Sequence, residues 1–144
     1  MANRPELFHS TSEESKHVLH KLIEFNAQCV PNAQLEEVNL CLKDDNGEIV
    51  AGLNSTVLWN WMEVDILWVD DKHRGQGLGK RLLEEAEQIA SAKNCTFIKL
   101  NTFSFQAPEF YKKYGYEVVA IFENAPIGCK HYYYKKDLTK IAKP

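Results

Sequence analysis

The sequence predicts an α+β domain with one N-terminal helix, followed by a mainly antiparallel sheet that two further helices interrupt. Three observations predict this class. Apolar residues recur at helical spacing before residue 30 and at strand spacing from residue 35 onward. An Asn46-Gly47 pair marks a tight hairpin turn between two strands. A glycine-rich turn at 73–79 then joins a strand to an amphipathic helix.

Length and composition describe an ordinary globular domain. The chain has 144 residues, so we expect residues 1–144 to form a single domain. Apolar residues make up 44% and charged residues 26%, which excludes a disordered or fibrous chain. The 17 basic and 20 acidic residues give a net charge of −3. This balance argues against a protein that binds nucleic acid through its phosphates.

The absence of targeting signals and the cysteine pattern both predict a cytoplasmic protein. The first ten residues lack the apolar segment of a signal peptide, and no apolar run of 18 residues predicts a membrane span. The four cysteines form neither a CxxC pair nor a zinc-binding spacing. We therefore expect reduced thiols and no metal site.

The first helix is expected over residues 10–28. Ser10 and Thr11 are each followed three residues later by a glutamate, which is the pattern of a capping box. Five apolar residues then share one helical face: Val18, Leu19, Leu22, Ile23 and Phe25. Pro31 ends the segment.

Three antiparallel strands are expected next, at 35–43, 48–59 and 62–69. The sequence Asp44-Asp45-Asn46-Gly47 separates the first two, because Asn-Gly supplies the positive φ that a tight turn requires. The third strand is rich in β-branched and aromatic residues.

Helices and strands alternate in the second half. A helix at 78–93 carries apolar residues at helical spacing, and a strand at 96–102 follows. A short helix begins at Pro108, whose missing N–H costs nothing in a first turn, and Gly115 ends it. Two closing strands are expected around a loop, at 116–123 and 130–137.

The turn between the third strand and the helix at 78–93 predicts an anion site. Its sequence is Arg74-Gly75-Gln76-Gly77-Leu78-Gly79-Lys80. Unpaired N–H groups at a helix N-terminus hold phosphates, and glycines let the backbone approach them. The turn is neither a Walker loop nor a Rossmann fingerprint, because the lysine–serine pair and the third glycine are missing. A plain helix-start turn is the alternative interpretation.

Two motifs resemble those of one family. Arg74-x-x-Gly77-x-Gly79 resembles the acetyl-CoA signature Q/R-x-x-G-x-G/A of the GNAT superfamily of N-acetyltransferases. Residues 107–116 resemble that family's A-x-x-x-Y-x-K-x-G-[FY] segment. The resemblance implies a three-layer fold with a mostly antiparallel mixed sheet of six or seven strands. Three or four helices would flank the sheet, which would be splayed at the strand ending near Val69.

The resemblance also implies where acetyl-CoA binds. The pantetheine arm would lie along the splayed strand, and the pyrophosphate would lie on the glycine-rich turn. The implied contacts are Leu67, Trp68, Val69, Arg74, Gly75, Gln76, Gly77, Leu78, Gly79 and Lys80. The family often has an asparagine near the start of the next helix, where this chain has Phe103-Ser104-Phe105-Gln106, and Gln106 is expected to contact the cofactor there.

The implied reaction is direct attack of an acceptor amine on acetyl-CoA in a ternary complex. Tyr111 matches the family tyrosine that protonates the departing thiolate, with a core aromatic as the alternative role. Glu63 is the candidate general base, and Asp65 or a water chain are the alternatives. The alternation of side chains along a strand is expected to put four residues on one face: Glu63, Asp65, Leu67 and Val69.

Other functions fit the same motifs. A non-catalytic acyl-CoA-binding or regulatory module would use the same fold, and a nucleotide-phosphate binder would use the same turn. The expected partners are acetyl-CoA and an amine acceptor, with neither nucleic acid nor membrane. The negative charge fits a cationic acceptor. Tyr132, Tyr133 and Tyr134 alternate on the last strand, which leaves one face for an acceptor pocket or a homodimer seam.

Overall fold

The computed structural model describes residues 3–32 and 34–138, and the chain divides into two compact units at residue 34. Its elements are α1 (Ser12–Cys29), β1 (Glu36–Lys43), β2 (Ile49–Leu58), β3 (Trp61–Val69), the 3₁₀ turn η1 (Asp71–His73), α2 (Leu78–Ala92), β4 (Phe97–Phe103), α3 (Pro108–Lys113), β5 (Glu117–Glu123) and β6 (Lys130–Asp137). The α+β class is confirmed, and each expected element lies within two residues of its predicted bounds.

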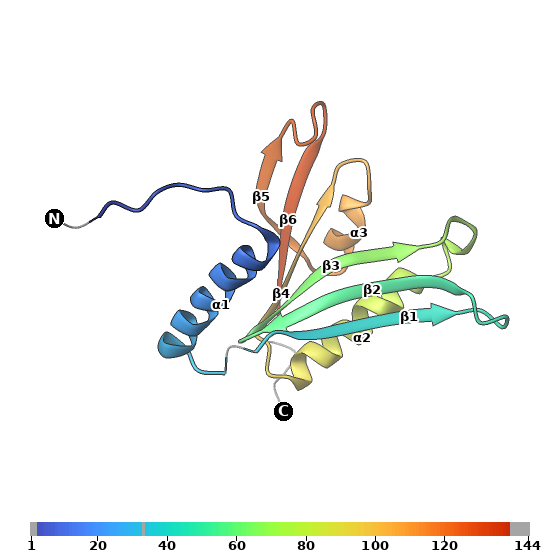
Figure 1. Cartoon of the computed structure of the whole chain (residues 1–144). Coiled ribbons are helices and arrows are strands. Elements are labelled where there is room, and N and C mark those ends of the chain that lie inside the picture. The colour runs from blue at the N-terminus through green and yellow to red at the C-terminus, as the bar shows by residue number, and fades with distance from the viewer. Residues whose placement is uncertain (1–2, 33, 139–144) are drawn as a thin grey trace. The chain divides into compact units, whose positions relative to one another are not determined.

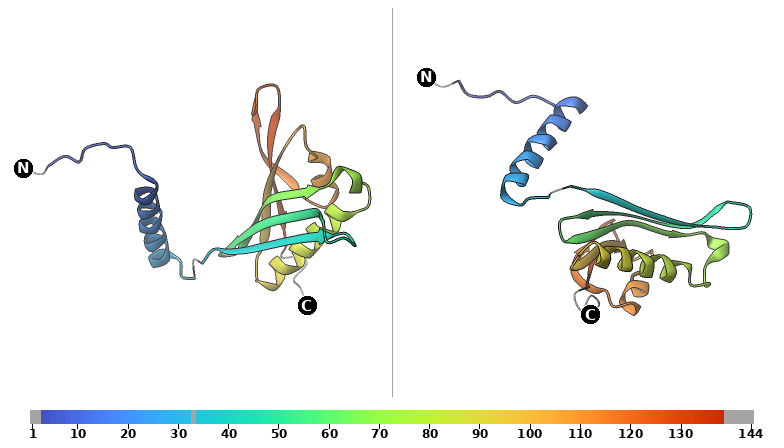
Figure 2. Two further views of the ribbon diagram at one scale, coloured as in Figure 1. Left: turned by 45° about the vertical axis from the view of Figure 1, so that its right-hand side comes forward. Right: turned by 90° about the horizontal axis from the view of Figure 1, so that it is seen from below.

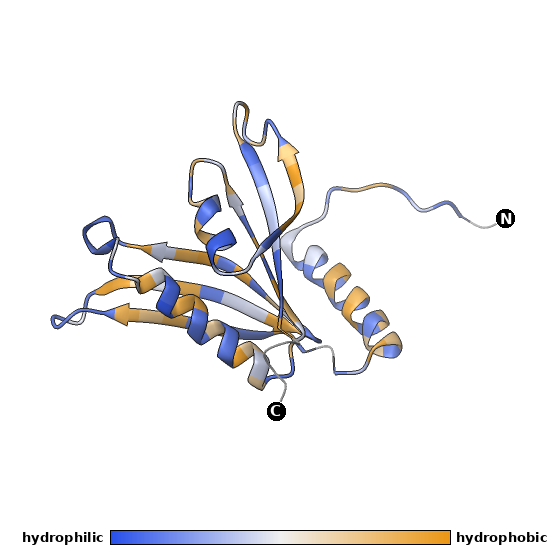
Figure 3. Cartoon of the chain, turned by 180° about the vertical axis from the view of Figure 1, so that it is seen from behind, coloured by the Kyte–Doolittle hydropathy of each residue, from blue (hydrophilic) through white to orange (hydrophobic). Residues whose placement is uncertain are grey.

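The N-terminal unit consists of an extended segment and α1. The predicted capping box is present: Glu14 N donates to Thr11 Oγ1 at 3.2 Å, and Thr11 N donates to Glu14 Oε1 at 2.8 Å. The helix therefore begins after Thr11 rather than at residue 10. Apolar and polar residues alternate along the turns of α1 (Figure 3). None of its residues is buried within its own unit.

The sheet has the strand order β1-β2-β3-β4-β6-β5, and only β3 and β4 pair in parallel (Figure 1). That parallel ladder is short, with Trp61–Val64 against Phe97–Leu100. Beyond it, β3 continues alongside β2 to Val69, and β4 continues alongside β6 to Phe103. Within the described residues, the facing edges of β3 past Val64 and of β4 past Leu100 therefore have no strand partner, which confirms the predicted splay.

The core lies between the sheet and α2, which runs along one face of the strands (Figure 2). Leu82, Leu83 and Ala86 of α2 are buried in the same cluster as Leu53 and Met62 of the sheet. The short helix α3 covers the same face, since Tyr111 packs against Tyr134 of β6. Within the described residues, no helix is long and apolar enough to cross a membrane.

A bulge in β3 corrects the predicted strand face. Asn54 pairs with Ile66 and Ser55 pairs with Val64, so Asp65 is an extra residue without a partner on β2. The extra residue reverses the alternation of side chains. Met62 and Val64 face the core before it, and Leu67 and Val69 face the core after it. Glu63 therefore lies on the face opposite to Leu67 and Val69, and the expectation that they share a face is wrong.

Candidate active site

A cavity with a volume of about 790 Å³ opens where β3 and β4 separate. Its walls come from three parts of the chain: the end of β3 (65–69), the glycine-rich turn with the start of α2 (73–75 and 77–80), and the end of β4 with the loop and α3 (101–103, 105–107, 110, 111, 113 and 114). All of these residues belong to the unit 35–144. The cavity therefore joins the two motifs that the sequence analysis singled out.

The glycine-rich turn presents a run of unpaired backbone donors to this cavity. In the described part of the chain, Arg74 N donates to Asp71 O and Arg81 N donates to Gly77 O, and no backbone acceptor is found for the N–H groups of residues 75–80. Gly77 is the N-cap of α2 and supplies no side-chain cap. Free N–H groups and the positive end of the helix dipole make this an anion site.

Glycine is required in the turn for two different reasons. Gly75 and Gly77 have φ angles of 81° and 78°, in the left-handed region, and a Cβ on either would meet open space. Gly79 is helical, and there a Cβ would lie 3.2 Å from Phe110 Cζ and 3.7 Å from Val69 Cγ2. The first two glycines shape the turn, and the third lets α2 approach α3.

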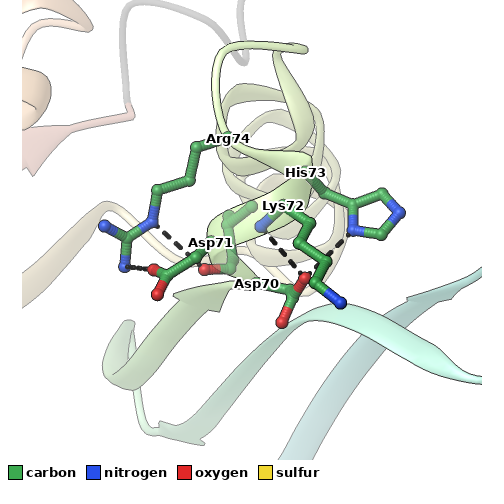
Figure 4. A network of polar contacts seen from close by, with 6 residues as sticks. Asp70, Asp71, Lys72, His73 and Arg74 are labelled. Carbon is green, nitrogen blue, oxygen red and sulfur yellow. Dashed lines mark hydrogen bonds and ion pairs between the residues drawn. The ribbon is translucent and has the colours of Figure 1, made fainter.

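A polar network fixes the chain between β3 and the turn (Figure 4). Arg74 pairs with Asp71 at 3.1 Å and donates from Nε to Val69 O at 3.4 Å. His73 Nδ1 donates to Asp70 Oδ2 at 3.2 Å, and this hydrogen bond lowers the pKa of the Asp70 carboxyl. Arg74 and His73 both line the cavity. Arg74, Lys80 and Lys113, which all line the cavity, supply positive charge near the free N–H groups.

Tyr111 lies at the inner wall of the cavity and is only 8% exposed. It sits in a cluster of three buried tyrosines. Tyr134 donates its hydroxyl to Pro108 O at 3.0 Å, and Tyr116 donates its hydroxyl to Glu87 Oε2 at 2.9 Å. The Tyr111 hydroxyl has no hydrogen-bond partner among the described residues, and it is not fully enclosed. Burial raises the pKa of Tyr111 to about 12, so the phenol keeps its proton at neutral pH.

The two carboxylates of β3 have different surroundings. Asp65, the bulged residue, lines the cavity. Glu63 does not line it and pairs with Lys99 of β4 at 3.8 Å across the parallel ladder. Glu63 is therefore set back from the cavity, and Asp65 is the carboxylate that reaches it.

Gln106 closes the loop that follows β4. Its side-chain Oε1 accepts from Phe103 N at 2.9 Å and from Thr102 Oγ1 at 3.0 Å. The residue lines the cavity, and its amide nitrogen has no hydrogen-bond partner among the described residues. This loop also brings Phe103 and Phe105 to the cavity wall, and neither was singled out from the sequence. The signal available in the sequence was the position of Phe105 in a turn, where polar residues and glycine are more usual.

The structure brings most of the predicted site together. The predicted residues that line the cavity are Leu67, Trp68, Val69, Arg74, Gly75, Gly77, Leu78, Gly79, Lys80, Gln106 and Tyr111. Gln76 and Glu63 are the two predicted residues outside the lining. Among the described residues, no group of three or more His, Cys, Asp or Glu side chains is arranged to hold a metal ion.

Comparison with known proteins agrees with this geometry. The model of the acetyltransferase (GNAT) family matches residues 5–116, a span that runs through both units. The blasticidin-S acetyltransferase of Streptomyces morookaense is 40% identical over 95 residues, 65% of this chain and 70% of that protein.

Two solved structures share the fold. An acetyltransferase from Bacillus cereus ATCC 14579 has a TM-score of 0.88 and 36% identity, and the match covers 93% of this chain and 98% of that one. A Bacillus anthracis protein described as a streptothricin acetyltransferase, solved with acetyl coenzyme A, has a TM-score of 0.63 and 23% identity, with 71% and 62% of the two chains covered. From its motifs, its splayed sheet and these matches, we conclude that the chain belongs to the GNAT family of acetyltransferases.

Proposed function

We propose that the protein transfers the acetyl group of acetyl-CoA to a primary amine of a small molecule or peptide, by direct attack within a ternary complex. One observation carries the proposal. A single cavity is lined by residues 75 and 77–80, whose N–H groups are free, by the end of β3 and by Tyr111. An anion site, a strand edge and a proton donor are the three things that this reaction requires of its protein.

The residues present fit acetyl-CoA. The N–H groups of residues 75–80 would bind the pyrophosphate, and Lys80 and Lys113 would add charge-assisted contacts. The edge of β3 beyond Val64 would pair with the pantetheine arm as an added strand does. When bound, acetyl-CoA supplies the activated acyl group.

Two proton transfers fall to side chains of this chain. The amine nitrogen forms a bond to the acetyl carbon while the carbon–sulfur bond breaks. Asp65 takes the proton that the amine loses, directly or through water, and Glu63 is the more distant carboxylate. The Tyr111 hydroxyl gives its proton to the sulfur that leaves. No cysteine lines the cavity in the described part of the chain, so no thiol there is placed to carry the acetyl group, which favours direct attack.

The blasticidin-S acetyltransferase that resembles this chain is named for a small-molecule acceptor, and this supports an acceptor of that size. The family match from residue 5 to residue 116 supports one acetyltransferase domain that includes residues of both units. The net charge of −3 fits a cationic acceptor.

The test is a steady-state assay with acetyl-CoA and a panel of amines, in which release of free CoA thiol is measured. We expect turnover with at least one amine and intersecting reciprocal plots when both substrates are varied. Parallel plots would contradict direct attack. Tight acetyl-CoA binding without turnover of any amine would favour the non-catalytic module instead.

A further inference from the structure

A row of three stacked aromatic rings lies beside the cavity, and two of them, Phe103 and Phe105, line it. The ring centroids of Phe105 and Phe103 are 5.4 Å apart with planes 8° from parallel, and those of Phe103 and His131 are 4.2 Å apart at 17°. Buried Thr102 faces the α3 side of the sheet, so its neighbour Phe103 faces the opposite side. The row therefore lies on the face of the sheet opposite to α3 and Tyr111.

Hydrogen bonds to neighbouring residues hold this row of rings in place. His131 Nε2 donates to Asn101 Oδ1 at 2.9 Å, which holds the inner ring. Ser104 N donates to Lys130 O at 2.9 Å, and Lys130 N donates to Ser104 Oγ at 3.0 Å. These bonds and the two that Gln106 accepts tie the turn carrying Phe105 to β4 and β6.

Phe105 is nevertheless 63% exposed. Exposure alone does not distinguish Phe105, since Phe122 is 56% exposed as well. What distinguishes it is that its ring is stacked on Phe103 and lines the cavity with much of its surface free. A fixed flat ring is preorganised for stacking, because little freedom remains to be lost when a ligand binds. Asp65 lines the same cavity and would attract a protonated amine.

We propose that the acceptor carries an aromatic or other planar unsaturated ring beside its amine, and that this ring stacks on Phe105. The inference rests on the proposed function and specifies its substrate class. The adenine ring of the cofactor is the competing occupant. The free N–H groups lie at the start of α2, which contacts α3 on the other face of the sheet, and this favours the acceptor.

The experiment compares two amines of the same charge and similar size, 2-phenylethylamine and 2-cyclohexylethylamine, by titration calorimetry on the full chain saturated with CoA. We expect the aromatic amine to bind roughly three- to tenfold more tightly, which is the range for aromatic pairs. A merely apolar wall would bind the saturated ring at least as well. Phe105→Leu should abolish the preference. Phe122→Leu is the matched control, because Phe122 is exposed but does not line the cavity.

Equal affinities for the two amines, or no binding of the aromatic amine, would overturn the stacking proposal. So would a Phe105→Leu variant that loses affinity for CoA while it retains the preference between amines. If the aromatic amine binds through Phe105 but no amine is acetylated, the stacking proposal is supported and the proposed function fails.

Discussion

Phe110 lies so close over Gly79 that a Cβ on the glycine would be 3.2 Å from the Phe110 ring. This contact joins the helix that carries the anion site to the helix that carries Tyr111, whose ring is 5.2 Å from that of Phe110. The geometry of the cofactor turn and the position of the proton donor therefore depend on one close packing.

Gly79→Ala should destabilise the protein by about 1 kcal/mol, because the Phe110 ring must move to admit a methyl group. In a Phe110→Leu background the same change should be neutral or stabilising, since alanine favours a helix by about 0.5–1 kcal/mol over glycine. Urea unfolding of the two single variants and the double variant measures this coupling. Additive effects would contradict the contact.

Gly77→Asp should abolish acetyl-CoA binding, because it sets a carboxylate among the unpaired N–H groups. The positive φ at Gly77 also adds a backbone cost of about 1–2 kcal/mol. Gly77→Asn is the matched control, since it has the same shape without the charge and asparagine tolerates this conformation. Calorimetry should show weakened binding for asparagine and none for aspartate. Equal acetyl-CoA affinities of the aspartate and asparagine variants would contradict an anion site in this turn.

Tyr111→Phe should lower kcat by about 10²–10⁴-fold with little change in acetyl-CoA affinity, because only the proton donor is lost. Its stability should change little, since the hydroxyl has no internal partner among the described residues. Tyr116→Phe should show the reverse pattern, with stability lowered by about 1 kcal/mol and kcat retained, because its hydroxyl bonds to Glu87. If kcat is unchanged in Tyr111→Phe, Tyr111 is not the proton donor and only packs in the core.

Alkaline pH should destabilise the protein partly through Tyr111. Burial raises the pKa of Tyr111 to about 12, so the folded state holds this proton more tightly than the unfolded state does. The contribution is fully present below about pH 10 and is lost as the pH rises toward about 12. At most it is about 2–3 kcal/mol. The free energy of unfolding of Tyr111→Phe should therefore fall less steeply with pH over this range. Parallel curves would contradict burial of this phenol.

Asp65→Asn should reduce kcat/KM at low pH more than Glu63→Gln does, because Asp65 lines the cavity and Glu63 is paired with Lys99. Both changes replace a carboxylate by an amide of the same shape, so the pair compares position alone. pH–rate profiles of the two variants check this. A larger effect of Glu63→Gln would restore Glu63 as the base, and two unchanged profiles would favour a water chain.

Local signals in the sequence predicted the helices and strands, and the two motifs predicted where the site lies. The Asn46-Gly47 turn, the capping box at Thr11 and the helical spacing after Leu78 each act within a few residues, and each was confirmed. The splay followed from the family resemblance and is confirmed by the short parallel ladder.

Features that depend on pairing between distant segments could not be predicted. The bulge at Asp65 appears only in the register of β3 against β2, so the side of Glu63 was predicted wrongly. The stacking of Phe105 on Phe103 depends on hydrogen bonds to Lys130, which is far away in the sequence. Both features shape the candidate acceptor side, where residue types alone carry little information.

The extra residue at Asp65 also makes β3 behave as two half-strands out of phase. If Asp65 were instead paired with β2 in a regular ladder, every later side chain would point to the other face of the sheet. Ile66 and Trp68, now on the open face, would turn inward, while Leu67 and Val69 would turn out of the core. Deleting Asp65 would leave an unbroken ladder in which Leu67 and Val69 still face the core, so the core does not require this residue, whose side chain lines the cavity.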